Sequence, residues 1–276
     1  MSSLRYEEKR ILIWGKTYPE LSIKNLETVC TGGVLEDGTP IRLYPIPYRY
    51  LSGSDQFSLY QWITARVARN FEDPRPESHR IDYESIKVGD AIPPDRDGWA
   101  ARAAVMFQDD SWQFPTMDVL YEAQRRDKTS IGVVNPREIL GVDLFARPDE
   151  DGLSFHEKLD RLRRMVAANR EQKRLFDEYD LPELKGLEFV SNRIRVSWLC
   201  HSPRCTGHKM QILDWGTIQL QRKIGDEKAL AGVRAACNLQ KNDVRFFVSN
   251  THAHQGSFSI VGIWYPKKVG QRLLFV

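Results

Sequence analysis

Two of the four cysteines and two of the six histidines of this chain fall within nine residues, from Cys200 to His208. Within that segment Cys200, Cys205 and His208 follow the spacing Cys-x4-Cys-x2-His. Thiolates and imidazoles are ligands that zinc prefers in proteins, where they surround it as a tetrahedron. A loop of this length brings three ligands together without long-range folding, because Pro203 stiffens it and Gly207 permits a tight approach. The segment therefore predicts a zinc site, and any fold of the chain must present it as a loop.

A fourth ligand has to come from elsewhere in the chain. We expect His252 or His254, because an extended segment with one residue between them places both imidazoles on one face. The alternatives are His201, Cys237 and Asp214. Four protein ligands make a structural site, whereas three ligands and a water leave room for chemistry.

A catalytic metal would need an acid/base nearby, and Asp214, six residues beyond His208, is the candidate. The alternative is that Asp214 caps the helix that begins there, since Asp is a favoured N-cap residue. We favour the helix cap, and with it a structural metal.

The composition excludes several classes of protein. The chain has 276 residues, of which 41% are hydrophobic and 28% charged, so it can build a substantial core. It contains no window of roughly 18 uncharged apolar residues, and the first ten residues lack the apolar run of a signal peptide. We therefore expect a cytoplasmic protein, in which paired thiols bind metal more often than they form disulfides. Cys30 and Cys237 are expected in the core.

The first half of the chain consists of short apolar runs separated by turn residues. Asp37-Gly38 between the runs Glu27–Leu35 and Ile41–Tyr44 predicts a β-hairpin. Segment Glu72–His79 is expected to be an extended, exposed loop. Further elements are a strand at Gln61–Ala68, a helix capped by Thr116 that ends near Arg126, and a strand pair around Ile131–Val134 and Ile139–Leu144. Together these predict a bent antiparallel sheet or open β-barrel with short helices.

The polar segment Arg147–Gly152 is rich in turn-forming residues and marks the expected domain boundary. We expect a β-rich domain over residues 1–147 and a helix-rich α+β domain with the zinc site over residues 154–276, which gives an α+β fold. Phe155–Tyr179 has the strongest helix pattern, with Ser154 as its N-cap. Strict alternation over Arg193–Trp198 predicts a half-buried strand. Further elements are helices within Leu213–Gln240, interrupted near Gly225-Asp226, and strands at Val244–Ser249 and Ser257–Trp264.

Basic residues are interleaved with aromatic residues in the first domain. Guanidinium groups pair with phosphate and aromatic faces stack on bases, so the mixture suits single-stranded or flipped nucleotides. The candidate contacts are Arg42, Tyr44, Tyr48, Arg49, Arg75 and Arg193. Acidic residues interrupt the basic stretches and the net charge is only +3, so an ordinary solvated surface is the alternative.

The block from Cys200 through Cys205-Thr206-Gly207-His208 to Asp214-Trp215 resembles one found in a bacterial protein family of unassigned function. The Tyr18-Pro19 and Arg42–Pro45 regions are similar to the same family, so the resemblance covers most of the chain. In that family a Glu often follows the Asp-Trp pair, and Gly216 in its place argues against a two-carboxylate site. The resemblance implies no activity.

Two functions are consistent with these features. In the first, a cytoplasmic protein binds nucleic acid or nucleotides, and its zinc is structural. In the second, a zinc-dependent hydrolase or lyase acts on a nucleotide or nucleic-acid base, with Asp214 as acid/base. We favour the first, because no second acid/base stands out. The sequence also lacks a phosphate-binding glycine loop, a Gly-x-Ser-x-Gly elbow, a His-Glu-x-x-His helix and the zinc-deaminase pattern.

Overall fold

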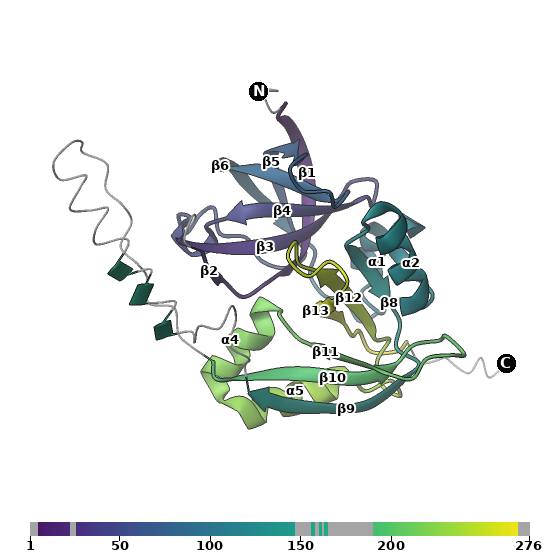
Figure 1. Ribbon diagram of the computed structural model, residues 1–276. Coiled ribbons are helices and arrows are strands. Elements are labelled where there is room, and N and C mark those ends of the chain that lie inside the picture. The colour runs from purple at the N-terminus through teal and green to yellow at the C-terminus, as the bar shows by residue number, and fades with distance from the viewer. Residues whose placement is uncertain are drawn as a thin grey trace.

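A computed structural model describes residues 5–22, 26–146, 156–157, 160–161, 163–164 and 190–269 (Figure 1). The class is mixed α+β, as the sequence predicts. In the N-terminal part the elements are β1 (Glu7–Lys16), β2 (Glu20–Ser22), β3 (Leu26–Leu35), β4 (Pro40–Ile46), η1 (Tyr48–Tyr50), β5 (Gln61–Arg69), β6 (Ser78–Ala91) and α1 (Ala100–Met106). They are followed by η2 (Asp110–Trp112), β7 (Gln113–Phe114), α2 (Met117–Asp127), β8 (Ile131–Val134), β9 (Glu138–Ala146), β10 (Asn192–Leu199), β11 (His208–Gln211), α4 (Trp215–Ile224), α5 (Asp226–Ala236), β12 (Arg245–Asn250) and β13 (Phe258–Trp264).

The strands β1, β3, β4, β5 and β6 form a closed barrel of five strands. β1 closes it, because its first half pairs with β5 and its second half pairs with β3. β4 pairs antiparallel with β3 and parallel with β6, and β5 pairs with β6. We expected a bent sheet or an open barrel, and the structure has a closed one. Closure is possible because β1, with ten residues, is long enough to pair with two strands.

The predicted hairpin is confirmed as β3 and β4. Its turn places Gly38 at a φ of +84°, where residues with a side chain are strained. A Cβ at Gly38 would also lie 2.7 Å from the backbone nitrogen of Asp109, so the turn packs directly under the segment before η2.

The molecule has three layers (Figure 1): the barrel, a sheet of order β13-β12-β8-β7 beneath it, and below that a sheet of order β11-β10-β9. α5 packs in the apolar core that the two sheets share. α4 contacts the barrel side of the molecule, where Trp215 packs on Tyr18 and Tyr48.

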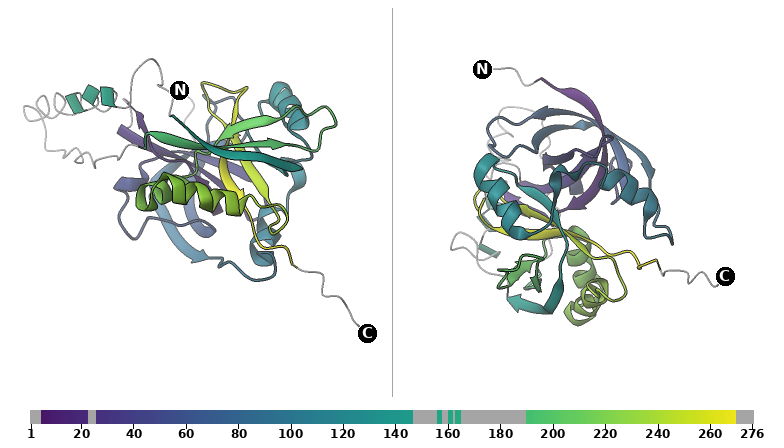
Figure 2. Two further views of the ribbon diagram at one scale, coloured as in Figure 1. Left: turned by 90° about the horizontal axis from the view of Figure 1, so that it is seen from below. Right: turned by 90° about the vertical axis from the view of Figure 1, so that its right-hand side faces the viewer.

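Side chains of β12 alternate between the two interfaces. Phe247 packs against Trp14 and Leu12 of the barrel, whereas Phe246 and Val248 pack against the core of the third layer. Figure 2 shows the same layers from two further sides.

The strand pairings join distant parts of the sequence. The predicted strands β8 and β9 both form, but β8 pairs with β12 and β9 pairs with β10, so they are not the expected pair. Both pairings join residues on the two sides of the polar segment that we expected to separate two domains. The division into two domains stays a prediction.

The expectation of a helix-rich C-terminal part is wrong for the described residues. Four strands, β10 to β13, cover slightly more of its described residues than α4 and α5 do. α4 and α5 confirm the two predicted helices, with Gly225 between them. Most of the helix expected at Phe155–Tyr179 lies outside the described residues. Among the helices of the described part, none is long and apolar enough to cross a membrane.

Candidate metal centre

The Cys200–His208 loop joins the two antiparallel strands β10 and β11. Trp198 of β10 lies opposite His208 of β11, so strand pairing brings Cys200, two residues after Trp198, close to the imidazole. The loop returns sharply, with the backbone N–H of Cys205 donating to the carbonyl oxygen of Ser202 at 3.1 Å. Regular β pairing therefore positions two of the three expected ligands, and a tight turn positions the third.

Gly207 provides the turn into β11. Its φ of +113° lies in the region that favours glycine, so the glycine before His208 is needed for the backbone path predicted from the sequence. The predicted role of this residue as a tight-turn former agrees with its conformation.

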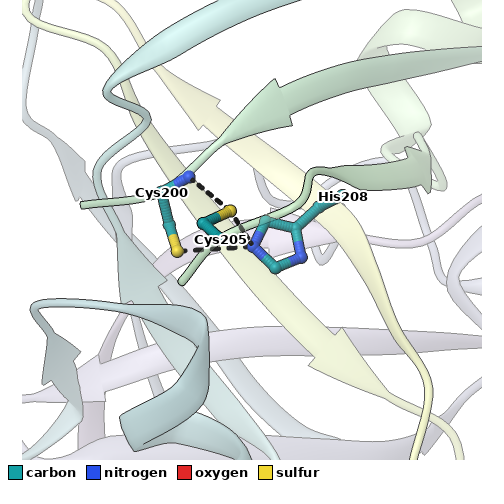
Figure 3. Close-up of side chains that lie close together, drawn as sticks. All are labelled: Cys200, Cys205 and His208. Atoms are coloured by element: carbon teal, nitrogen blue, oxygen red, sulfur yellow. Dashed lines mark hydrogen bonds between the residues drawn. The ribbon is translucent and has the colours of Figure 1, made fainter. Parts of the chain in front are cut away.

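The three ligand atoms converge, as Figure 3 shows. His208 Nε2 lies 3.3 Å from Cys205 Sγ and 3.4 Å from Cys200 Sγ. Zinc bonds of about 2.3 Å to sulfur and 2.05 Å to nitrogen, at tetrahedral angles, would set a sulfur–nitrogen distance of about 3.6 Å. The group can therefore hold a metal ion with a small adjustment of its side chains.

The surroundings of His208 favour the neutral imidazole, which is the form that binds metal. Cys200 is fully buried, whereas Cys205 and His208 are half-buried. Burial lowers the pKa of His208, with a smaller opposing effect from Asp118, so the neutral imidazole is favoured. Its ring packs 4.7 Å from that of Trp198, which shields one side of the cluster.

The helix α2 also contacts the loop, which the sequence did not predict. The hydroxyl of Ser202, between the two cysteines, donates to Asp118 Oδ2 at 2.6 Å. Thr116 caps this helix as expected, accepting a hydrogen bond from the backbone of Val119. Asp118 is one residue inside the helix, and no motif connects it with a loop 84 residues further along the chain.

Other expected ligands lie outside the group of three. His252 and His254 are exposed in the segment between β12 and β13, and His201 is exposed next to Cys200. Cys237 is buried at the end of α5, where burial raises the pKa of its thiol to about 12. Within the described part of the chain, the cluster comprises Cys200, Cys205 and His208 and includes none of these four residues.

Asp214 is the N-cap of α4. Its carboxylate accepts hydrogen bonds from the backbone N–H of Thr217 at 2.7 Å and from the Thr217 hydroxyl at 2.9 Å. Burial raises the pKa of this carboxyl, although these bonds and Lys16 oppose the change. Six residues of chain at up to about 3.3 Å each separate Asp214 from His208, and Asp214 does not belong to the ligand cluster found in the described part of the chain. The residue lies outside the metal cluster and is used by the helix.

Two of the expected nucleic-acid contacts, Arg42 and Arg75, lie in a buried ion network between the barrel and the middle sheet. Arg42 donates to the carbonyl oxygens of Ser130 and Asn250, each at 3.1 Å, and Arg75 donates to the same Asn250 oxygen at 3.0 Å. Arg75 also pairs with Asp73 at 2.6 Å. Burial alone would raise the pKa of Asp73, but hydrogen bonds from Arg75 and Ser78 hold it well below its usual range. The network comprises Arg42, Asp73, Arg75, Glu77, Ser78, Ser130 and Asn250.

The expected exposed loop at Glu72–His79 is thus corrected, since Asp73, Arg75 and Glu77 are all buried. Charged residues in a turn-rich segment suggest a solvated loop, but here Asp73 and Arg75 pair within the loop, and Arg75 and Glu77 bond to polar groups across the interface.

The remaining expected contacts are scattered. Arg193 is buried in β10, and the half-buried Tyr48 donates to the carbonyl oxygen of Phe57 at 2.6 Å. The Nζ of Lys16 lies 3.7 Å from the centre of the Tyr48 ring, and burial lowers the pKa of this amine to about 8. Tyr44 is exposed and Arg49 is half-buried. The six residues therefore do not form one open surface.

Comparisons with known proteins agree with the expected family of unassigned function. Residues 113–276 match a family model described as Domain of unknown function (DUF8757). Residues 7–108, which hold the barrel and α1, match a model described as Domain of unknown function (DUF8758). A search of curated proteins found no match.

Proposed function

Because this chain belongs to the family defined by Domain of unknown function (DUF8757), whose description gives no activity, we propose its function from the metal centre. The Cys200–His208 loop binds one zinc ion, and this ion stabilises the fold. The observation that supports this most directly is the convergence of two thiol sulfurs and one imidazole nitrogen at nearly tetrahedral spacing. Thiolate and imidazole donors in such a set favour zinc among the divalent ions.

A structural role is favoured over a catalytic one. A hydrolase or lyase of the kind considered above would use Asp214 to move a proton at the metal. Proton transfer needs a carboxylate within about 3 Å or one intervening water, whereas the Asp214 carboxylate lies outside the ligand cluster and is bonded to Thr217. Its hydrogen bonds to Thr217 already explain why an Asp is at this position.

The direct test is the metal content of untagged protein purified without chelator, measured by elemental analysis. We expect close to one zinc per chain in the native protein and in the Cys30→Ser variant, because Cys30 lies in β3, away from the loop. Cys205→Ser should lose most of the zinc. Native protein without metal, or equal metal content in both variants, would reject the site.

Binding of single-stranded nucleic acid by the barrel is a second candidate function. Numbered in chain order, the barrel strands follow the order 1-2-3-5-4 and close on themselves, with a parallel pair between the third and the fifth. Five-stranded Greek-key barrels of the OB-fold type bind oligonucleotides or oligosaccharides, partly through the loop between strands four and five. The corresponding loop here connects β5 and β6 and carries Phe71, whose exposed fraction is 83%.

The loop has the chemistry for stacking on a base. The Arg69 guanidinium lies 5.8 Å from the centre of the Phe71 ring, and Arg80 of β6 forms an ion pair with Glu72 of the same loop. Stacking of one base on an aromatic ring contributes about 1–3 kcal/mol. This surface replaces Arg42 and Arg75 as the place where the barrel would meet a polymer, since those two arginines are buried.

Fluorescence anisotropy with a labelled single-stranded oligonucleotide tests this candidate. We expect Phe71→Ala to weaken binding about 5-fold to 150-fold, as loss of one stacking contact implies. Tyr265→Ala, which removes an exposed aromatic ring beyond the end of β13, should leave the affinity unchanged. Equal effects of the two variants would reject a specific role for the loop.

A further inference from the structure

A structural zinc site has four protein ligands, and the Cys200–His208 loop supplies three. We propose that Asp118, in the first turn of α2, is the fourth ligand. This inference rests on the zinc site proposed above and adds to it a residue from a distant part of the chain. It also closes the site, which excludes the open position that catalysis would need.

A hydrogen bond fixes Asp118 to the same turn that positions Cys205. Ser202 is buried between the two cysteines, and its hydroxyl donates to Asp118 Oδ2 at 2.6 Å. The carbonyl oxygen of Ser202 accepts the hydrogen bond from Cys205 that closes the turn. The carboxylate is therefore held at the loop by one of the loop's own residues.

Apolar packing also holds α2 against the loop. Leu120 packs in the same apolar cluster as Cys200, which holds this helix against the loop. The N-terminal half of α2 thus faces the ligand cluster.

A carboxylate can hold Ser202 and the metal together. It has two oxygens that accept in several directions, so one can keep the Ser202 hydroxyl while the other binds zinc at about 2.0–2.2 Å. Residues such as Ser202 that orient a ligand in this way are a regular part of metal sites.

The expected ligands His252 and His254 are less favourable candidates for the fourth position. Both are exposed, and their backbones bond within their own turn, His254 N–H to Thr251 and the His252 carbonyl oxygen to Gln255. Neither histidine nor Asp118 is part of the three-residue cluster found among the described residues, so each would have to move to reach the metal. Asp118 is half-buried and already bonded to the loop.

The test compares zinc affinity, measured by competition with a chromophoric chelator, in full-length protein and three variants. Asp118→Asn removes the anionic ligand with little change of shape, Ser202→Ala removes only the hydrogen bond, and His252→Ala with His254→Ala removes the alternative ligands. Loss of a residue behind a ligand typically weakens metal binding about 10-fold to 100-fold. We therefore expect Asp118→Asn to weaken zinc binding by more than about 100-fold, Ser202→Ala by less, and the double histidine variant not at all.

The visible absorption of the cobalt-substituted proteins gives a second measurement, because it reports the coordination sphere directly. The bands should shift in Asp118→Asn and keep their positions in Ser202→Ala. Circular dichroism of the variants in chelator, together with Asp118→Ala, checks that the fold is retained before metal is added.

Equal weakening by Asp118→Asn and Ser202→Ala, with unchanged cobalt spectra, would overturn the inference, since Asp118 would then act only through Ser202. A large loss in the double histidine variant would overturn it as well. In both cases the native protein still binds zinc and the proposed site stands. If the native protein binds no zinc, the proposed function fails and this inference with it.

Discussion

The metal loop and the buried ion network are both groups of polar side chains, but their residues are distributed differently along the sequence. The three expected ligands of the loop lie within nine residues, and one strand pairing brings them together. The network joins Arg42 to Ser130, 88 residues away, and Arg75 to Asn250, 175 residues away. A group of polar side chains that local geometry holds together can therefore be recognised from the spacing of its residues in the sequence. A polar group held by tertiary contacts looks in the sequence like an ordinary solvated residue.

The largest expected effect is the removal of metal. Ligand binding to the folded state alone stabilises it by about 4 kcal/mol when free zinc exceeds the dissociation constant about 1,000-fold. Addition of a strong chelator should lower the free energy of unfolding by about this amount, as measured by denaturant titration. Chelator should not change the free energy of unfolding of the Cys205→Ser variant. If chelator destabilises this variant as much as the native protein, the metal loop is not the source of the stabilisation.

A somewhat smaller effect is expected when the network is broken. Asp73 and Arg75 are almost fully buried, so Arg75→Met leaves the Asp73 carboxylate buried without its partner, at a cost of about 3 kcal/mol or more. Asp73→Asn combined with Arg75→Met should cost less than Arg75→Met alone, because no unpaired charge remains. Denaturant titration with and without chelator measures the free energy of unfolding of the single and the double variant.

The two effects should also add. The metal loop and the network share no residue, and independent sites contribute additively to stability. If chelator lowers the free energy of unfolding of Arg75→Met and of the native protein by different amounts, the metal loop and the network are energetically coupled. They could then not be treated as independent regions.

The smallest effect is expected at Asp214. Replacing an N-cap residue with Ala costs about 1 kcal/mol, so Asp214→Ala should lose this much stability and keep its zinc. The measurements are the thermal midpoint and the metal content of the purified variant, with Thr217→Ala as a milder control because the backbone N–H of Thr217 still bonds to Asp214. Loss of zinc in Asp214→Ala would return Asp214 to the metal site.

Much of the fold follows from local sequence patterns. The Asp37-Gly38 hairpin, the Thr116 cap and the break at Gly225 each depend on a few neighbouring residues, and each is found where it is expected. The choice of strand partners is not local. Closure of the barrel requires β1 to pair with both β3 and β5, and no pattern within β1 says which neighbours it takes.

The candidate site divides in the same way. Cys200, Cys205 and His208 were predicted from their spacing, and they converge in the structure. Asp118 could not be predicted, because it reaches the loop only after α2 packs on the third layer. Arg42 and Arg75 were interpreted as a binding surface, since nothing in the sequence shows that a second sheet covers them.

One pairing in the third layer has a consequence for the connection between its strands. Ala146 at the end of β9 lies opposite Asn192 at the start of β10, so the chain leaves and re-enters this sheet at points about 5 Å apart. The metal loop follows the opposite end of β10. The connection between β9 and β10 therefore has to bridge only the width of one backbone pairing, and it does so at the end of the sheet away from Cys200.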